Sequence, residues 1–230
     1  SIDEGTRKLN VVAAGAVTAT ARPIGEVDLA AAQSRSSGVA ELDRTLGGGL
    51  VPGAVVLLAG EPGVGKSTLL LTVAAESART GLTALYVTGE ESTAQVRLRA
   101  ERLSAIHPSL WLAAENELSA VVAHIDAVKP DLLIIDSIQT MASAAVEGSP
   151  GGVTQVREVA NTAIRIAKDR GITVILVGHV TKDGSIAGPR LLEHLVDVVL
   201  NFEGDRHSRL RLVRSIKNRF GATDEVGCFD

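Results

Sequence analysis

The sequence has almost no cysteine: one residue, Cys228, among 230. A single cysteine excludes an internal disulfide bond and a cysteine-cluster zinc site in this chain. Aromatic residues make up only 2% of the chain, so recognition of nucleic acid by rows of stacked bases is not expected. No apolar stretch approaches the length that spans a bilayer, and no secretory signal pattern opens the sequence. We therefore expect a cytoplasmic protein without a membrane partner.

The chain also lacks an excess of positive charge, since its formal net charge is −4 at pH 7. Whole-molecule attraction to nucleic acid is therefore absent, and any such binding must use local patches. Hydrophobic residues make up 45% of the chain, which is enough for a sizeable core in one α/β domain. Residues 1–36 are rich in small residues without clean periodicity. We interpret them as a linker or arm that precedes a domain at 37–230.

What the sequence does contain is a phosphate-binding loop between an apolar run at 54–59 and a helical pattern at 66–80. Every fixed position of the pattern G-x-x-x-x-G-K-[ST] is matched, by Gly60, Glu61, Pro62, Gly63, Val64, Gly65, Lys66 and Ser67. The glycines let backbone N–H groups approach a polyphosphate, and the helix N-terminus favours its negative charge. Lys66 supplies a cation for the outer phosphates, and the Ser67 hydroxyl is a ligand for Mg²⁺. Together with Thr68, these residues predict an ATP-binding site.

A second apolar run, at 131–137, contains the carboxylate of Asp136 near its end. A run that is apolar on both faces is typical of a buried strand in a parallel sheet. The carboxyl ends of such strands are where open α/β sheets bind ligands. We therefore assign Asp136 as the Walker B aspartate, which holds Mg²⁺ through water and completes the nucleotide site.

Two carboxylates and a histidine follow other predicted strands. Glu90 and Glu91 come after the run at 82–88, and His179 follows the run at 172–178. Hydrolysis of a γ-phosphate needs a group that orients or deprotonates water, and Glu90 is the first candidate and Glu91 the second. His179 is a candidate sensor of the γ-phosphate, although a lone histidine is more often structural.

Strand and helix patterns alternate along the chain, which predicts an α/β fold with a mostly parallel central sheet flanked by helices. The expected strands lie at 54–59, 82–88, 110–113, 132–136 and 172–178, and the expected helices at 39–46, 66–80, 92–103, 116–128 and 154–170. Ser92 and Gln95 are spaced as a capping box, so a helix should begin right after Glu91.

Near the end of the chain, the alternation of strands and helices gives way to two neighbouring strand patterns. The runs at 196–202 and 208–216 predict an antiparallel hairpin. Its second arm places Arg209 and Arg211 on one face, and two interpretations remain open. The arm is either a solvated edge strand that resists aggregation or a functional basic patch.

Two other segments, at 142–152 and 181–190, leave the same edge of the predicted sheet as the phosphate loop. Loops in that place often carry function, and otherwise they are surface connections. The second segment contains two cations, Lys182 and Arg190, which favours a binding role. The first has no cation, and both interpretations stay open for it.

These motifs together resemble the RecA-type ATPase core, and within it the bacterial RadA (Sms) family. The shared segments are 47–53, 60–67, 86–92, 178–182 and, most specific of all, Lys217-Asn218-Arg219-Phe220-Gly221, which is similar to the family's KNRFG motif. The resemblance covers the chain from about residue 37 to its end. It implies a DNA-dependent ATPase of recombinational repair, a helicase-type motor that forms homohexamers around single-stranded DNA and drives branch migration. A recombinase is a candidate partner.

The resemblance also implies roles for particular residues. By this analogy Glu90 is the catalytic glutamate. Lys217 and Arg219 would reach the γ-phosphate bound by the neighbouring subunit, as trans-acting cations do in phosphoryl transfer. The two loops defined above, with Lys182 and Arg190, would face the DNA in the ring channel.

The sequence departs from the family pattern in two respects. It has no cysteines for the family's four-cysteine zinc element, and nothing after Asp230 for its Lon-protease-like domain, so we expect a truncated ATPase core or a fragment. Two other functions remain open: a KaiC-like signalling ATPase without DNA, and a small-molecule P-loop kinase, which would need an arginine-rich lid. No motif defines the adenine contacts, for which Gln95 and Arg97 are the candidates.

Overall fold

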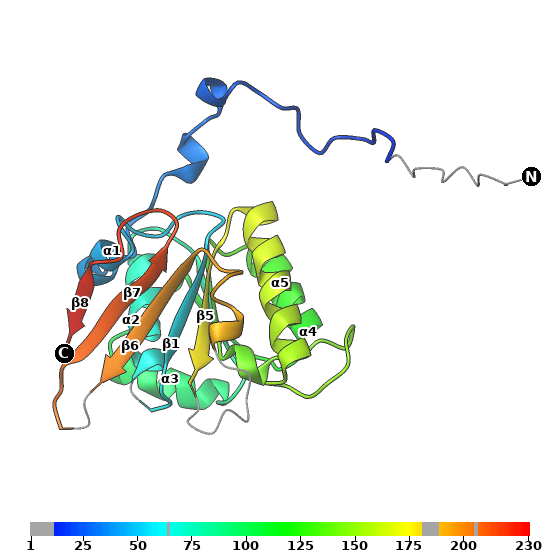
Figure 1. The fold of residues 1–230 in the computed structure, drawn as a ribbon. Coiled ribbons are helices and arrows are strands. Elements are labelled where there is room, and N and C mark those ends of the chain that lie inside the picture. Colours follow the sequence, from blue (N-terminus) through cyan, green and yellow to red (C-terminus); the bar gives the residue numbers. More distant parts are fainter. Residues whose placement is uncertain (1–11, 64, 181–188, 205–206) are drawn as a thin grey trace, which may run out of the picture. The chain divides into compact units, whose positions relative to one another are not determined.

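The computed structural model describes residues 12–63, 65–180, 189–204 and 207–230. The chain divides into two units, residues 1–30 and 31–230. The described part of the first unit is exposed along its whole length and contains the 3₁₀ turn η1 (Ile24–Glu26). A second turn, η2 (Ala30–Ala32), spans the boundary. All strands and α-helices of the described residues belong to the second unit (Figure 1).

The described residues of the second unit form one eight-stranded sheet, in the order β3-β2-β4-β5-β1-β6-β7-β8. Its strands are β1 (Val55–Gly60), β2 (Ala84–Thr88), β3 (Leu110–Ala114), β4 (Leu132–Asp136), β5 (Thr173–His179), β6 (Val198–Gly204), β7 (Arg211–Asn218) and β8 (Val226–Phe229). The strands from β1 to β6 pair in parallel, whereas β7 is antiparallel to both β6 and β8. The predicted fold class, a mostly parallel sheet with a C-terminal antiparallel hairpin, is confirmed.

The sequence analysis did not predict the strand β8. It pairs with β7 from Arg211 and Phe229 to Arg214 and Val226. Because β8 covers the outer side of β7, the second arm of the hairpin is not at the edge of the sheet. The interpretation of that arm as a solvated edge strand is therefore wrong.

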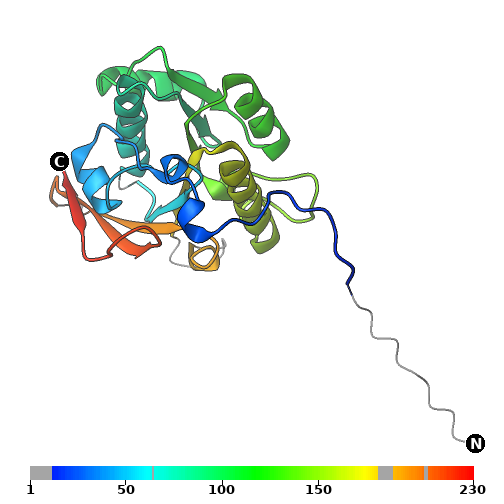
Figure 2. The same cartoon turned by 90° about the horizontal axis from the view of Figure 1, so that it is seen from above.

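Helices cover both faces of the sheet (Figures 1 and 2). They are α1 (Ala40–Thr45), α2 (Lys66–Arg79), α3 (Thr93–Arg102), α4 (Leu118–Val128) and α5 (Val153–Arg170). Apolar side chains of α1, α2 and α3 share one core cluster, and those of α4 and α5 share another on the opposite face. The capping box of α3 is confirmed, since Ser92 and Gln95 exchange backbone-to-side-chain hydrogen bonds. None of the helices in the described ranges combines the length and apolarity that a membrane crossing requires.

The strand β4 shows why the central strands are apolar at every position. Leu133 and Ile135 pack in the cluster with α4 and α5, whereas Leu132 and Ile134 pack in the cluster with α2. Side chains alternate across a sheet, so a strand covered on both faces needs an apolar residue at each position. The first charged residue, Asp136, therefore comes where the strand ends.

Candidate functional site

Four parallel strands end at one edge of the sheet, and their last residues define the site. β1 ends at Gly60, β2 at Thr88, β4 at Asp136 and β5 at His179. In the sheet register Thr88 pairs with Asp136, and Gly60 pairs with His179. The residues that the sequence predicted for nucleotide chemistry therefore follow strands that are direct neighbours.

The phosphate loop joins β1 to α2 and needs glycine for two different reasons. Gly63 and Gly65 have φ angles of +78° and +100°, in the left-handed region where a side chain is strained. At Gly60 the reason is packing, because an added Cβ would lie 2.7 Å from the Phe202 carbonyl oxygen of β6. Of the other predicted loop residues, two are exposed and one lies outside the described residues: Glu61, Pro62 and Val64, respectively.

Lys66, the first residue of α2, is buried beneath the loop with 3% of its surface exposed. Its Nζ donates hydrogen bonds to the carbonyl oxygens of Gly60 at 2.8 Å and Glu61 at 2.6 Å. Burial lowers the pKa of Lys66 to about 8, while the negative charges of Asp136, Glu90 and Glu61 act in the opposite direction. A phosphate bound here would stabilise the charged form of the lysine.

The carboxylate of Asp136 lies against the first turn of α2. Its Oδ2 accepts hydrogen bonds from the hydroxyls of Ser67 and Tyr86, and the residue is 4% exposed. A serine hydroxyl beside a carboxylate supplies the oxygen ligands with which proteins hold Mg²⁺ next to nucleotide phosphates. The two predicted metal ligands, Ser67 and Asp136, are thus brought together, and their chemistry fits Mg²⁺.

Tyr86 is a site residue that the sequence analysis missed. It lies on β2 and is 1% exposed. Burial, the charge of Asp136 and the hydrogen bond between the two groups raise its pKa, so the hydroxyl stays protonated and donates to the carboxylate. The sequence could have indicated this role. The hydroxyl of a buried tyrosine usually needs a hydrogen-bond partner, and β2 adjoins the strand that carries the Walker B aspartate.

The two candidate glutamates are directed to different places. Glu90 Oε1 lies 3.1 Å from His179 Nε2 and accepts a hydrogen bond from Ser137 Oγ at 3.3 Å. Glu91 instead forms an ion pair with Arg99 of α3 through both carboxylate oxygens. Glu90 therefore lies at the edge where β4 and β5 end, whereas Glu91 is held by a neighbouring helix.

His179 is positioned by a residue that the sequence analysis did not single out. Gln139 belongs to η3 (Ile138–Thr140), and its side-chain amide bonds both main-chain groups of His179. The imidazole Nδ1 is buried and has no hydrogen-bond partner among the described residues. With a proton on Nε2, the imidazole can donate a hydrogen bond to Glu90.

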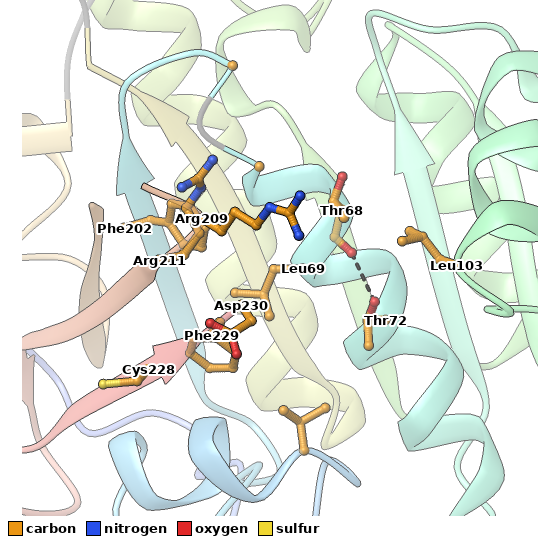
Figure 3. Close-up of a pocket in the computed structure, with 13 residues that line it drawn as sticks. Thr68, Leu69, Thr72, Leu103, Phe202, Arg209, Arg211, Cys228, Phe229 and Asp230 are labelled. Atoms are coloured by element: carbon orange, nitrogen blue, oxygen red, sulfur yellow. Dashed lines mark hydrogen bonds between the residues drawn. The ribbon is translucent and has the colours of Figure 1, made fainter. Parts of the chain in front are cut away.

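A cavity of about 680 Å³ opens beside the phosphate loop and the first turns of α2 (Figure 3). Its wall includes Gly65 and Thr68 from the loop and helix, Phe202 from β6, and Arg209 from the turn of the hairpin. A cavity of this size, lined by both apolar and polar groups, is typical of a small-ligand site. Its position next to the phosphate loop suits the nucleoside part of a nucleotide.

Gln95 and Arg97, the candidates for adenine contacts, do not line this cavity. Gln95 closes the capping box of α3, and Arg97 pairs with Glu101 at 2.9 Å on an exposed face of that helix. The cavity is lined instead by Arg209 and Arg211, and Figure 3 shows the Arg209 side chain extending toward α2. The contact of Gln95 and Arg97 with adenine therefore stays a prediction.

Lys217 and Arg219, the predicted trans-acting cations, contact the segment before β6 in their own chain. Lys217 Nζ donates to the carbonyl oxygens of Glu193 at 2.8 Å and Val196 at 3.0 Å. Arg219 Nη1 pairs with Asp197 Oδ1 at 3.0 Å. Within the described residues, neither cation contacts the phosphate loop of the same chain.

The loop at 142–152 is held by a buried glutamine of α5. Gln155 is 2% exposed, and its Oε1 accepts a hydrogen bond from the Ser143 N–H at 2.7 Å. Its Nε2 donates to several loop carbonyls, including that of Val146 at 3.0 Å. The loop thus has a defined backbone at the same edge as the phosphate loop.

The loop at 181–190 is described only at its end. Lys182 lies outside the described residues. Arg190, in the short turn η4 (Pro189–Leu191), is exposed. The DNA-binding role expected of these two cations stays a prediction.

Comparison with known proteins agrees with the fold. Residues 21–185 match the family model described as an AAA domain. This match covers more than half of the chain, which therefore belongs to that family and carries a P-loop ATPase domain of RecA-like fold.

The particular relatives share one name. The chain is 58% identical over 98% of its length to the DNA repair protein RadA of Mycolicibacterium smegmatis, and covers 50% of that relative. It is 56% identical over 98% of its length to the RadA of Mycobacterium tuberculosis, and 51% identical over 91% to that of Listeria monocytogenes, covering 46% of each. The chain spans about half the length of these curated relatives. The resemblance to the RadA family is confirmed, and the signalling alternative is not favoured.

Proposed function

We propose that this chain is the ATPase core of a DNA-dependent motor in homologous recombination and DNA repair. It hydrolyses ATP with Mg²⁺ at the subunit interfaces of a homohexameric ring around single-stranded DNA and, as a helicase-type enzyme, drives branch migration, with a recombinase as partner. The observation that carries the proposal is the convergence of Lys66, Ser67, Asp136 and Glu90 at one edge of the sheet. The names of relatives at 51% to 58% identity support the role in DNA repair.

In this proposal the triphosphate lies over the phosphate loop, where backbone N–H groups and the N-terminus of α2 face its charge. Lys66 exchanges its two carbonyl contacts for oxygens of the outer phosphates. Ser67 and Asp136 hold Mg²⁺, which when bound neutralises charge that develops on the phosphate oxygens. The nucleoside extends into the cavity beside α2, where Phe202 and Arg209 contact it.

Glu90 orients the attacking water. The water oxygen forms a bond to the γ-phosphorus while the bond from this phosphorus to the bridging oxygen breaks, and the water proton passes to Glu90. Ser137 and His179 keep the carboxylate at the strand ends, and His179 registers whether the γ-phosphate is present. Glu91, paired with Arg99, has a structural role instead.

A second copy of the chain completes the site. Lys217 and Arg219 reach the γ-phosphate in the adjacent subunit. The Arg219 side chain is 48% exposed, and among the described residues it bonds Asp197 through Nη1, which leaves further guanidinium donors that can face a phosphate. The two loops at the carboxyl edge, with Lys182 and Arg190, face the DNA.

ATP turnover by the full-length polypeptide, measured with and without single-stranded DNA, tests the motor function. We expect DNA to raise the rate, because the loops that contact it begin at the strand ends that carry the catalytic groups. Equal rates in a preparation shown to form rings would contradict the motor and favour a DNA-independent ATPase.

Mixing two inactive variants tests the action across subunits. Lys66→Ala removes the phosphate cation and Lys217→Ala removes the cation supplied by the neighbour, so each variant alone should be inactive. Some interfaces of a mixed ring combine an intact Lys66 with an intact Lys217, and turnover should partly recover. Arg214→Ala, an exposed cation on the same strand as Lys217, should be active by itself. No recovery despite demonstrated co-assembly would contradict the trans role.

A further inference from the structure

Gln139 connects two segments that carry the groups of the site. It lies in η3, three residues after Asp136, and is 6% exposed. The His179 N–H donates to Gln139 Oε1 at 3.1 Å, and Gln139 Nε2 donates to the His179 carbonyl oxygen at 3.0 Å. A planar amide that bonds both main-chain groups of one residue fixes that residue as a neighbouring strand would.

The Gln139 amide bonds the main chain of β5 beyond the last residue that pairs with β4. Main-chain pairing of β4 with β5 stops at Ile135 and Leu176, three residues before His179. On the other side of β5, pairing with β1 continues to Gly60 and His179. His179 therefore lies between the strand that leads into the phosphate loop and the turn η3, and Gln139 is its hydrogen-bonded connection to that turn.

The His179 side chain extends this connection to the candidate catalytic base. Its Nε2 lies 3.1 Å from Glu90 Oε1, and the same oxygen accepts a hydrogen bond from Ser137 at 3.3 Å. A displacement at Glu90 therefore reaches η3 through His179 and the side-chain amide of Gln139. The loop at 142–152 follows η3 closely along the chain.

We infer that Gln139 is a positioning residue that couples the γ-phosphate site to the loop at 142–152, which follows η3. The inference rests on the proposed function, since it needs a nucleotide at Glu90 and a ligand at this loop. Gln139 does not touch the reacting atoms and acts by holding His179. Without its amide, hydrolysis persists, but the state of the nucleotide no longer reaches the loop.

A buried glutamine can also serve only to hold a loop, and this chain contains a matched example. Gln155 is 2% exposed and binds residues 143–148 through its side-chain amide. In the described part of the chain, its hydrogen bonds reach neither His179 nor η3. Gln155→Ala therefore removes a buried amide of the same chemistry and leaves the connection through Gln139 intact.

The first test is the ratio of DNA-stimulated to basal ATP turnover in the full-length polypeptide. For Gln139→Ala we expect basal turnover within about threefold of the natural protein, and a loss of stimulation of about tenfold at saturating single-stranded DNA. Gln139→Glu, which keeps the volume but sets an oxygen against the His179 carbonyl, should show the same loss. An unchanged ratio in Gln139→Ala, or a parallel loss of both rates, overturns the inference.

Hydrogen exchange separates a failure of this inference from a failure of the proposed function, because it needs no DNA. In the natural protein and in Gln155→Ala, a non-hydrolysable ATP analogue should slow amide exchange at 138–141. In Gln139→Ala the analogue should slow exchange in the phosphate loop only. No effect at 138–141 in the natural protein, or an effect retained in Gln139→Ala, overturns the coupling. Coupling without any stimulation by DNA would refute the motor alone.

Discussion

Lys66 provides a pH test of the phosphate site, because its burial lowers its pKa to about 8. With this value, about one molecule in ten carries a neutral Lys66 at pH 7, and about ten in eleven do at pH 9. A lysine in water keeps its charge throughout this range. The perturbation is therefore a change of pH alone, which removes the charge from this lysine before it affects exposed ones.

The size of the effect follows from proton uptake. A bound polyphosphate favours the charged lysine, so nucleotide binding takes up a proton wherever the free site is neutral. The dissociation constant should therefore rise as pH passes through 8, and should be about tenfold larger at pH 9 than at pH 7. Unfolding does not cause this loss. Since the folded pKa lies below the ordinary value of 10.5, the unfolded chain binds more protons between these values, and the contribution of Lys66 to stability rises with pH.

Titration with a fluorescent ADP analogue between about pH 7 and pH 9 measures this effect, because phosphate groups titrate lower, near pH 6. Thiols titrate in the same range, and Cys228 lines the cavity, so Cys228→Ser is the control and should keep the pH dependence. Lys66→Arg stays charged and should lose it, whatever its affinity. A flat affinity in the natural protein, with Cys228→Ser also flat, would refute the argument that a buried, titrating Lys66 binds the phosphates.

The carboxylates, a glycine and the hairpin give further tests. Glu90→Gln should slow ATP turnover by about 10²–10⁴-fold with nucleotide affinity retained, and a larger rate loss in Glu91→Gln would reverse the assignment. Gly89→Ala should lower the free energy of unfolding in urea by about 1–3 kcal/mol, since its Cβ would lie 2.1 Å from Thr140 Oγ1; full stability would contradict this packing. Arg209→Ala should weaken ADP and ATP binding alike, by about tenfold, whereas a loss confined to ATP would place Arg209 at the γ-phosphate.

Residues that follow apolar strands could be located from the sequence, because the apolar run shows where each strand ends. All positions from Leu132 to Ile135 are buried, so the charged residue after them marks the end of β4. Parallel pairing then brings that end beside the ends of the neighbouring strands. The positions of Asp136, Glu90 and His179 at one edge follow from this rule without any knowledge of side-chain contacts.

Contacts between distant segments could not be found in this way. Tyr86 and Gln139 are ordinary in their own segments and acquire their roles only because β2 and η3 adjoin the ends of β4 and β5. The strand β8 has only four residues, too few for an apolar alternation to identify it. The cavity beside the phosphate loop takes Arg209 from a hairpin far along the chain, so no local pattern near Gln95 could have defined it.

From the charges around Lys66 we predict that one chain alone hydrolyses ATP slowly. The phosphate loop supplies Lys66, while the carboxylates of Asp136, Glu90 and Glu61 lie near enough to act on its pKa. A lysine with three carboxylates acting on it stabilises poorly the charge that spreads over a transferring phosphoryl group. Mg²⁺ offsets part of this deficit, and under the proposed assembly the cations of the adjacent copy's KNRFG motif supply the rest. Turnover per chain should therefore rise with protein concentration as copies assemble. A constant turnover per chain across the range in which assembly is observed would show that a single chain holds all the charge it needs.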